Sequence, residues 1–245
     1  MLRELLAPNA SPMTLDGTRT FLVGGERVAV IDPGSSDGGH LAALKAAVGS
    51  GQVVAVLVTH RHPDHAAGAA QLARRLDAPL RSAGGGTLVD GDRIATDAGE
   101  LVGVATAGHT PEHMALHWPA GHAVFCGDLM MGGLDTTLVA PPEGHLAHYL
   151  ASLERVRALA PAVIHPSHGP SFEDPPAALD AYVRHRTERL EQVRAAVAAG
   201  DASVGHIISR IYEEPLPDAL RAAARGAVEA YLAYLVERGE VAWPD

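Results

Sequence analysis

Apolar residues form short runs along the first part of the chain and longer, helically spaced stripes after residue 174. Residues 20–25 and 27–34 are rich in β-branched and apolar residues and meet at a Gly-Gly pair, which predicts a hairpin of two strands. Residues 52–60 are an almost continuous apolar run, typical of a strand covered on both faces. Residues 38–48 and 65–77 have helical composition and spacing. We therefore expect strands that alternate with helices, an α/β arrangement.

Three further apolar runs each lead into a glycine-rich loop that holds a histidine or an aspartate: residues 100–109, 114–128 and 162–169. Together with the run 52–60, four strand ends bring a potential ligand to a loop. Loops at one edge of a rigid sheet often build a functional site. We therefore expect the four loops to form one site.

The pattern changes after residue 174, where the predicted elements are all helices. Residues 203–214 and 217–241 predict two helices, and a longer one precedes them. That first helix has one apolar stripe, made of Leu179, Tyr182, Val183, Leu190, Val193 and Val197. The chain therefore divides into residues 1–174 and a helical domain of residues 175–245.

Composition and charge exclude several classes of protein. At 245 residues with 47% hydrophobic residues, the chain can bury a substantial core. Its net charge of −10 argues against a broad surface for nucleic acid or for anionic membrane. Cys126 is the only cysteine, so no internal disulfide forms, as is usual in a reducing compartment. With no signal-like segment and no long apolar run, we expect a cytoplasmic protein without a membrane partner.

The densest group of candidate ligands is the sequence HRHPDH, which begins at His60. His60 and His62 alternate along an extended segment, so their imidazoles project to the same side and can bind one ion. Pro63 disfavours helix at His62, whereas Asp64 and His65 begin the next helix and can point to a second position. Neutral imidazole and carboxylate suit Zn²⁺, so we expect two Zn²⁺ ions, with iron or manganese as alternatives.

The other three loops complete a set of seven ligands. His109 and His168 are each flanked by glycine, which permits close approach of the backbone. Asp128 follows a buried run and a glycine, and its carboxylate can bridge two ions. The predicted metal ligands are His60, His62, Asp64, His65, His109, Asp128 and His168.

These motifs resemble the metallo-β-lactamase-fold hydrolases, whose pattern is His-x-His-x-Asp-His, then Gly-His-Thr, Gly-Asp and Gly-His-Gly. The resemblance covers roughly residues 15–170 and implies a four-layer αββα sandwich. It implies one metal bound by His60, His62 and His109, a second bound by Asp64, His65 and His168, and Asp128 as the bridge. It also implies that Asp32, in VIDPG, supports the ligands from behind. Ala107 and Ser167 stand where the family often has proline and glycine, and neither change removes a ligand.

Within the family, the chain resembles the branch of β-lactamase-like protein 2, a single-strand endoribonuclease, and of related thioesterases. This resemblance implies a winged-helix-like tail over residues 175–245. Acidic residues outnumber basic ones in that tail, which counts against RNA binding. The tail also holds a basic cluster that we interpret as a solvated helix face: Arg184, Arg186, Arg189 and Arg194.

We predict hydrolysis of an ester, thioester, lactone or related acyl bond of a small molecule by a hydroxide that bridges two Zn²⁺ ions. Asp64 would orient that nucleophile or accept its proton. His113 and Tyr149 are candidates for supporting the ligands or contacting the substrate. The alternatives on the same site are a single-strand RNA endonuclease and a weak β-lactam hydrolase. Redox chemistry at iron is disfavoured, because His62 stands where the di-iron branch commonly has glutamate.

Overall fold

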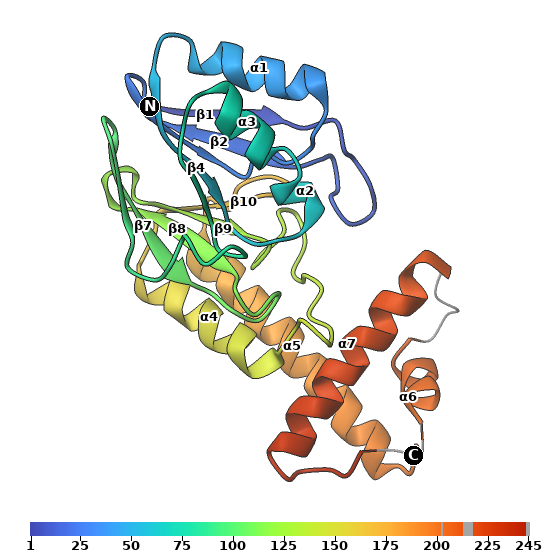
Figure 1. The fold of residues 1–245 in the computed structure, drawn as a ribbon. Helices are drawn as coiled ribbons and strands as arrows, with labels where there is room; N and C mark the ends of the chain where they lie inside the picture. The colour runs from blue at the N-terminus through green and yellow to red at the C-terminus, as the bar shows by residue number, and fades with distance from the viewer. Residues whose placement is uncertain (202, 213–217, 244–245) are drawn as a thin grey trace.

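The computed structural model describes residues 1–201, 203–212 and 218–243, and its core is a pair of five-stranded sheets (Figure 1). The first sheet has the order β1-β2-β3-β4-β5. Strands β2 and β3 pair antiparallel, as predicted, whereas β3, β4 and β5 run parallel. The strands span β1 (Leu2–Leu6), β2 (Arg19–Val23), β3 (Arg27–Ile31), β4 (Gln52–Val58) and β5 (Leu80–Ser82).

The second sheet has the order β10-β9-β8-β7-β6 and is antiparallel except for the parallel pair β9 and β10. A 3₁₀ turn, Pro119–Gly121, joins β8 to β9. The strands span β6 (Arg93–Thr96), β7 (Gly99–Ala105), β8 (Met114–Trp118), β9 (Ala123–Gly127) and β10 (Val163–Pro166).

Helices cover the outer face of each sheet, which gives four layers (Figure 1). The first sheet is covered by α1 (Gly38–Val48) and α3 (Ala69–Arg75), and the second by α4 (Leu146–Ala158) and α5 (Pro175–Ala198). Side chains alternate along the strands accordingly. Phe21 of β2 packs between the sheets beside Phe125 of β9, whereas its neighbour Leu22 packs under the helices. The αββα sandwich is therefore confirmed.

The helix predicted over residues 65–77 is wrong as one continuous element. The chain forms α2 (Pro63–Ala66) and, after a break at Ala67 and Gly68, α3. A Cβ atom at Gly68 would lie 2.5 Å from the carbonyl oxygen of Ser35, so the backbone of the break packs directly on the loop after β3. This close approach positions α2, which carries two of the predicted ligands.

Sequence patterns did not reveal β1, β5, β6 or α4. The three strands are short and carry exposed positions, so each lacks a clear apolar run. Helix α4 mixes charged and apolar residues and buries Tyr149 and Leu153 on one face only.

The tail consists of α5, α6 (Val204–Ile211) and α7 (Asp218–Glu237), which confirms the three predicted helices. The described part of the tail contains no strand. Leu179 and Tyr182 of α5 and Leu232 of α7 belong to the same buried cluster as Tyr149 of α4 and Val124 of β9. The tail and the second sheet thus share one core. No helix in the described ranges combines the length and apolarity needed to cross a membrane.

Deleting residues 175–245 should prevent residues 1–174 from folding stably. Each large apolar side chain exposed by the deletion costs about 1.5–3 kcal/mol, and several such losses exceed a typical stability of about 5–15 kcal/mol. Thermal unfolding and solubility of the two lengths provide the test, with a deletion of residues 242–245, beyond both α7 and Val241, as the control. A soluble fragment 1–174 with an unchanged melting temperature would contradict the shared core.

Candidate metal centre

The predicted ligands meet where the two sheets bring their loops together. His60 and His62 follow β4, and Asp64 and His65 lie in the first turn of α2. The second sheet and its connections supply the rest: His109 after β7, Asp128 after β9 and His168 after β10. Elements far apart in the sequence thus assemble all seven side chains.

The first group of candidate ligands comprises His60, His62, His109 and Asp128, whose ligand atoms all lie within 4.8 Å of one another. His62 Nδ1 lies 3.0 Å from His60 Nε2 and 3.1 Å from His109 Nε2. Asp128 Oδ2 lies 4.0 Å from His60 Nε2 and 3.7 Å from His109 Nε2. Three imidazole nitrogens and a carboxylate oxygen therefore face one point, as a metal ion requires.

The second group comprises Asp64, His65, His168 and the same Asp128, again within 4.8 Å. His65 Nε2 lies 3.2 Å and His168 Nε2 3.3 Å from Asp128 Oδ1. Asp64 Oδ2 lies 3.2 Å from His168 Nε2. Asp128 thus turns one oxygen to each group, which is the arrangement of a bridging carboxylate.

Several of these donor atoms lack hydrogen bonds although they are buried. His65 Nε2, His168 Nε2 and Asp128 Oδ1 have no hydrogen-bond partner among the described residues. Buried polar atoms without partners are costly and therefore rare. Because all three are common metal ligands and they point at one another, the site fits a metal ion.

Neighbouring charges shift the pKa values of His65 and Asp128 in the second group. Burial by itself would lower the pKa of His65, but the carboxylates of Asp128 and Asp32 outweigh it and raise that pKa well above its usual range. Burial would raise the pKa of Asp128, but His65 and His168 hold it well below its usual range. The carboxylate of Asp128 is therefore ionised at neutral pH, the form that binds metal.

Most ligand histidines are held by a hydrogen bond at the ring nitrogen that faces away from the group. His109 Nδ1 lies 2.8 Å from the carbonyl oxygen of Leu138, and His168 Nδ1 lies 3.1 Å from that of Gly17. A carbonyl oxygen only accepts, so each Nδ1 carries the proton and leaves Nε2 free as a ligand.

Asp32 is the central support of the site. It is fully buried after β3 and accepts hydrogen bonds from Thr59 N, Thr59 Oγ1 and His65 Nδ1, each at 2.8 Å, and from Ser167 Oγ at 3.0 Å. The serine that replaces the family's glycine at residue 167 therefore adds a hydrogen bond between the two sheets.

The other two candidates support the ligands and do not face the solvent. His113 is buried, its Nε2 accepts a hydrogen bond from the backbone N–H of Asp128 at 3.1 Å, and burial lowers its pKa to about 3. Tyr149 is also fully buried, and its hydroxyl donates to the carbonyl oxygen of Leu129 at 2.8 Å. Neither ring is placed to contact a substrate, so we assign both to holding the segment around Asp128.

Sequence patterns missed Glu143. Its Oε2 lies 2.9 Å from His62 Nε2, on the side of the ring opposite the ligand atom Nδ1, and its Oε1 pairs with Arg61 at 2.6 Å. Arg61 pairs in turn with Glu112. The hydrogen bond from Arg61, with a smaller contribution from His62, lowers the pKa of Glu143. No local motif marks Glu143, because it lies 81 residues after His62 in an irregular loop.

Glycine at residue 108 allows His109 to approach the group. Gly108 has φ +138°, and a Cβ atom there would lie 2.4 Å from the backbone nitrogen of Tyr149. The loop after β7 therefore packs directly on the first turns of α4, and any larger residue would displace His109.

The fold and the site define the class of protein. Residues 13–86 match the family described as the metallo-beta-lactamase superfamily. The match identifies a domain of this superfamily of metal-dependent hydrolases in the chain.

Among its relatives is the Beta-lactamase-like protein 2 homolog of Caenorhabditis elegans, which is 28% identical over 259 residues that cover 98% of this chain and 86% of the relative. A beta-lactamase domain protein from Burkholderia ambifaria has the same fold, with a TM-score of 0.81 and 24% identity over 98% of this chain and 87% of its own. The protein TTHA1623, solved in a di-iron-bound form, is 27% identical, with a TM-score of 0.57, over 69% of this chain and 94% of its own. The first two similarities include the helical tail.

Replacing Asp32 with asparagine should destabilise the protein by about 3–5 kcal/mol. Both carboxylate oxygens accept hydrogen bonds, so the amide nitrogen of asparagine would face a donor in either orientation of the amide. The negative charge that pairs with His65 would also be lost. Chemical denaturation measures the loss. Asp97→Asn is the matched control: Asp97 also accepts backbone hydrogen bonds, from Gly25, Glu26 and Arg27, but it is exposed. Equal losses in the two variants would show that burial of Asp32 is unimportant.

Replacing Glu143 with glutamine should weaken metal binding roughly 10-fold to 100-fold, since carboxylates behind ligand histidines typically contribute that much. Competition with a chelator measures the affinity. Glu112→Gln is the control, because Glu112 also pairs with Arg61 but is not hydrogen-bonded to His62. If both variants lose the same affinity, the effect comes from Arg61 and the role of Glu143 is refuted.

Proposed function

We propose that the protein is a dinuclear zinc hydrolase that cleaves an ester, thioester, lactone or related acyl bond of a small molecule. The observation that carries this proposal is the division of seven ligands into two groups that share Asp128, with buried donor atoms that lack other partners. His60, His62 and His109 would hold one ion and Asp64, His65 and His168 the other, with one oxygen of Asp128 directed at each.

Zinc is the metal that these donors favour. The ligands are nitrogen and carboxylate oxygen without thiolate, and each group offers four donors, the number that Zn²⁺ prefers. TTHA1623, which was solved in a di-iron-bound form, is similar to only 69% of this chain. Elemental analysis distinguishes the two metals directly.

When bound, the metal ions supply Lewis acidity, which lowers the pKa of water at the site and polarises the bond under attack. Asp64 is the residue positioned to handle the proton. Its side chain is 26% exposed, which makes it accessible from solvent at an otherwise buried group. Burial would raise the pKa of Asp64, but the neighbouring His168, whose Nε2 lies 3.2 Å from Asp64 Oδ2, and the charge of His65 lower it. The carboxylate is thus ionised and can orient a water molecule or accept its proton.

The charges of the tail support a small-molecule substrate over RNA. Of the basic cluster on α5, Arg186 is 3% exposed, and Arg194 is paired with both Glu191 and Glu240. Phosphate backbones require several accessible cations, and these two side chains do not supply them. Cleavage of single-stranded RNA is therefore included in the test as the alternative activity.

The test combines metal content with a panel of substrates. Protein purified without chelator should contain about two zinc ions per chain and should hydrolyse an acyl thioester or a lactone in preference to a β-lactam or a short single-stranded RNA. His62→Ala and Asp128→Asn should each lose metal and reduce kcat/KM by roughly 100-fold or more.

His206→Ala is the control, because His206 is exposed near the start of α6 and its removal leaves both ligand groups intact. Full metal content and activity in His62→Ala or Asp128→Asn would refute the site. Preferential cleavage of RNA would refute the substrate class and leave the metal site standing.

A further inference from the structure

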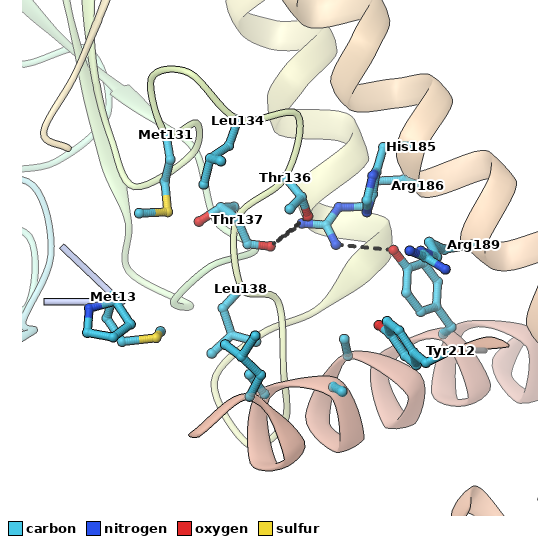
Figure 2. Close-up of a pocket in the computed structure, with 16 residues that line it drawn as sticks. Met13, Met131, Leu134, Thr136, Thr137, Leu138, His185, Arg186, Arg189 and Tyr212 are labelled. Atoms are coloured by element: carbon cyan, nitrogen blue, oxygen red, sulfur yellow. Dashed lines mark hydrogen bonds between the residues drawn. The ribbon is translucent and has the colours of Figure 1, made fainter. Parts of the chain in front are cut away.

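A second feature of the molecule is a pocket of about 330 Å³ between the loop after Asp128 and the helical tail (Figure 2). Met131, Leu134 and Leu138 line it from the loop, and Ala224 and Ala227 line it from α7. Its size and mostly apolar lining are typical of small-molecule sites.

The pocket and the metal centre share the segment of residues 128–138. Leu138 lines the pocket, and its carbonyl oxygen accepts the hydrogen bond of the ligand His109. Met131 lines the pocket and follows Asp128 by three residues, and Gly132 N donates to the carbonyl oxygen of the ligand His168 at 2.8 Å. The pocket and the candidate metal centre therefore have this one segment in common, although none of the seven candidate ligands lines the pocket.

A buried cation lines this apolar pocket. Arg186 is 3% exposed, and it donates from Nη1 to the hydroxyl of Tyr231 at 3.1 Å and from Nη2 to the carbonyl oxygen of Thr137 (Figure 2). Its guanidinium also lies 4.8 Å from the ring centre of Tyr149. Nε of Arg186 is buried and has no hydrogen-bond partner among the described residues.

No described carboxylate neutralises this charge. Arg186 forms no ion pair with a described acidic residue, and the side chains that line the pocket include no aspartate or glutamate, although the chain has a net charge of −10. A buried charge without a counter-charge is unfavourable. Arg186 therefore favours an anionic ligand in this pocket.

A second cation lies on the same side. Arg189 lines the pocket next to Tyr212, with its guanidinium 5.0 Å from the ring centre (Figure 2). The neighbouring Arg184 is exposed and does not line the pocket. The basic cluster interpreted from the sequence as a solvated helix face is thus divided: Arg186 and Arg189 face the pocket, and Arg184 faces the solvent.

We propose that this pocket binds the acyl part of the substrate, and that this part is an apolar chain or ring system with a carboxylate at the end remote from the bond that is cleaved. The carboxylate is bound by Arg186 and Arg189, whose planar guanidinium groups match it in shape and charge. The substrate is therefore a monoester or monothioester of an apolar dicarboxylic acid. The reaction in this proposal rests on the proposed function, whereas binding in the pocket does not.

Binding is tested first on the full-length protein with its metal removed. Calorimetric titration with octanoate should show one binding site, and titration with octylamine, which has the same chain and the opposite charge, should show at least about tenfold weaker binding. Equal affinities for the two probes would overturn the proposal.

Variants distinguish the pocket from the histidine groups as the place of binding. Arg189→Gln should weaken octanoate binding about tenfold, and Ala227→Phe should abolish it by filling the pocket. The controls are Arg184→Gln on α5 and Ala222→Phe on α7, which alter exposed positions outside the pocket. If the controls weaken binding as much as the pocket variants, octanoate binds elsewhere and the proposal fails.

Turnover by the metal-loaded protein completes the test. A monothioester of suberic acid should have a KM at least about tenfold lower than the octanoyl thioester, and Arg189→Gln should remove most of that difference. Equal KM values would refute the distal carboxylate. If octanoate binds as expected but the metal-loaded protein cleaves no acyl substrate, binding of a carboxylate in the pocket is supported and the proposed hydrolysis is refuted.

Discussion

The buried carboxylate of Asp32 is the interaction on which the metal centre depends. Asp32 lies at the end of β3 and accepts hydrogen bonds from Thr59 after β4, from His65 in α2 and from Ser167 after β10. A charge in the interior is stable only when donors surround it. The donors come from both sheets, so the same bonds that satisfy Asp32 also fix the sheets relative to each other and orient a ligand histidine.

Hydrogen bonds from surrounding residues hold the candidate ligands in place. Asp32 bonds to His65, and Thr59 bonds to His60. His113 bonds to the backbone of Asp128, and Glu143 bonds to His62. Each support acts on the atom opposite a ligand atom or on the backbone beside it, so a change in any of them alters metal binding without removing a ligand. The site is therefore a property of the whole sandwich edge and not only of seven side chains.

The helical tail connects to this site through the segment of residues 128–138. Tyr182 of α5 accepts a hydrogen bond from Met131 N, and Arg186 donates to the carbonyl oxygen of Thr137. On its other side, the same segment contacts His109 and His168. Because the tail also shares a core with the second sheet, the shape of the pocket and the position of the ligands are linked.

The sequence by itself indicated the alternation of strands and helices and placed the seven candidate ligands at strand ends, because short apolar runs followed by glycine and histidine are local signals. It did not reveal Glu143. It also indicated the wrong environment for Arg186, because the basic cluster that contains Arg186 was interpreted as a solvated helix face, whereas Arg186 is buried. Only the tertiary structure decided those roles, since they depend on contacts between segments 81 and 49 residues apart. Periodicity along one helix reports which side chains share a face, but what covers that face depends on packing with α7 and with the loop after Asp128.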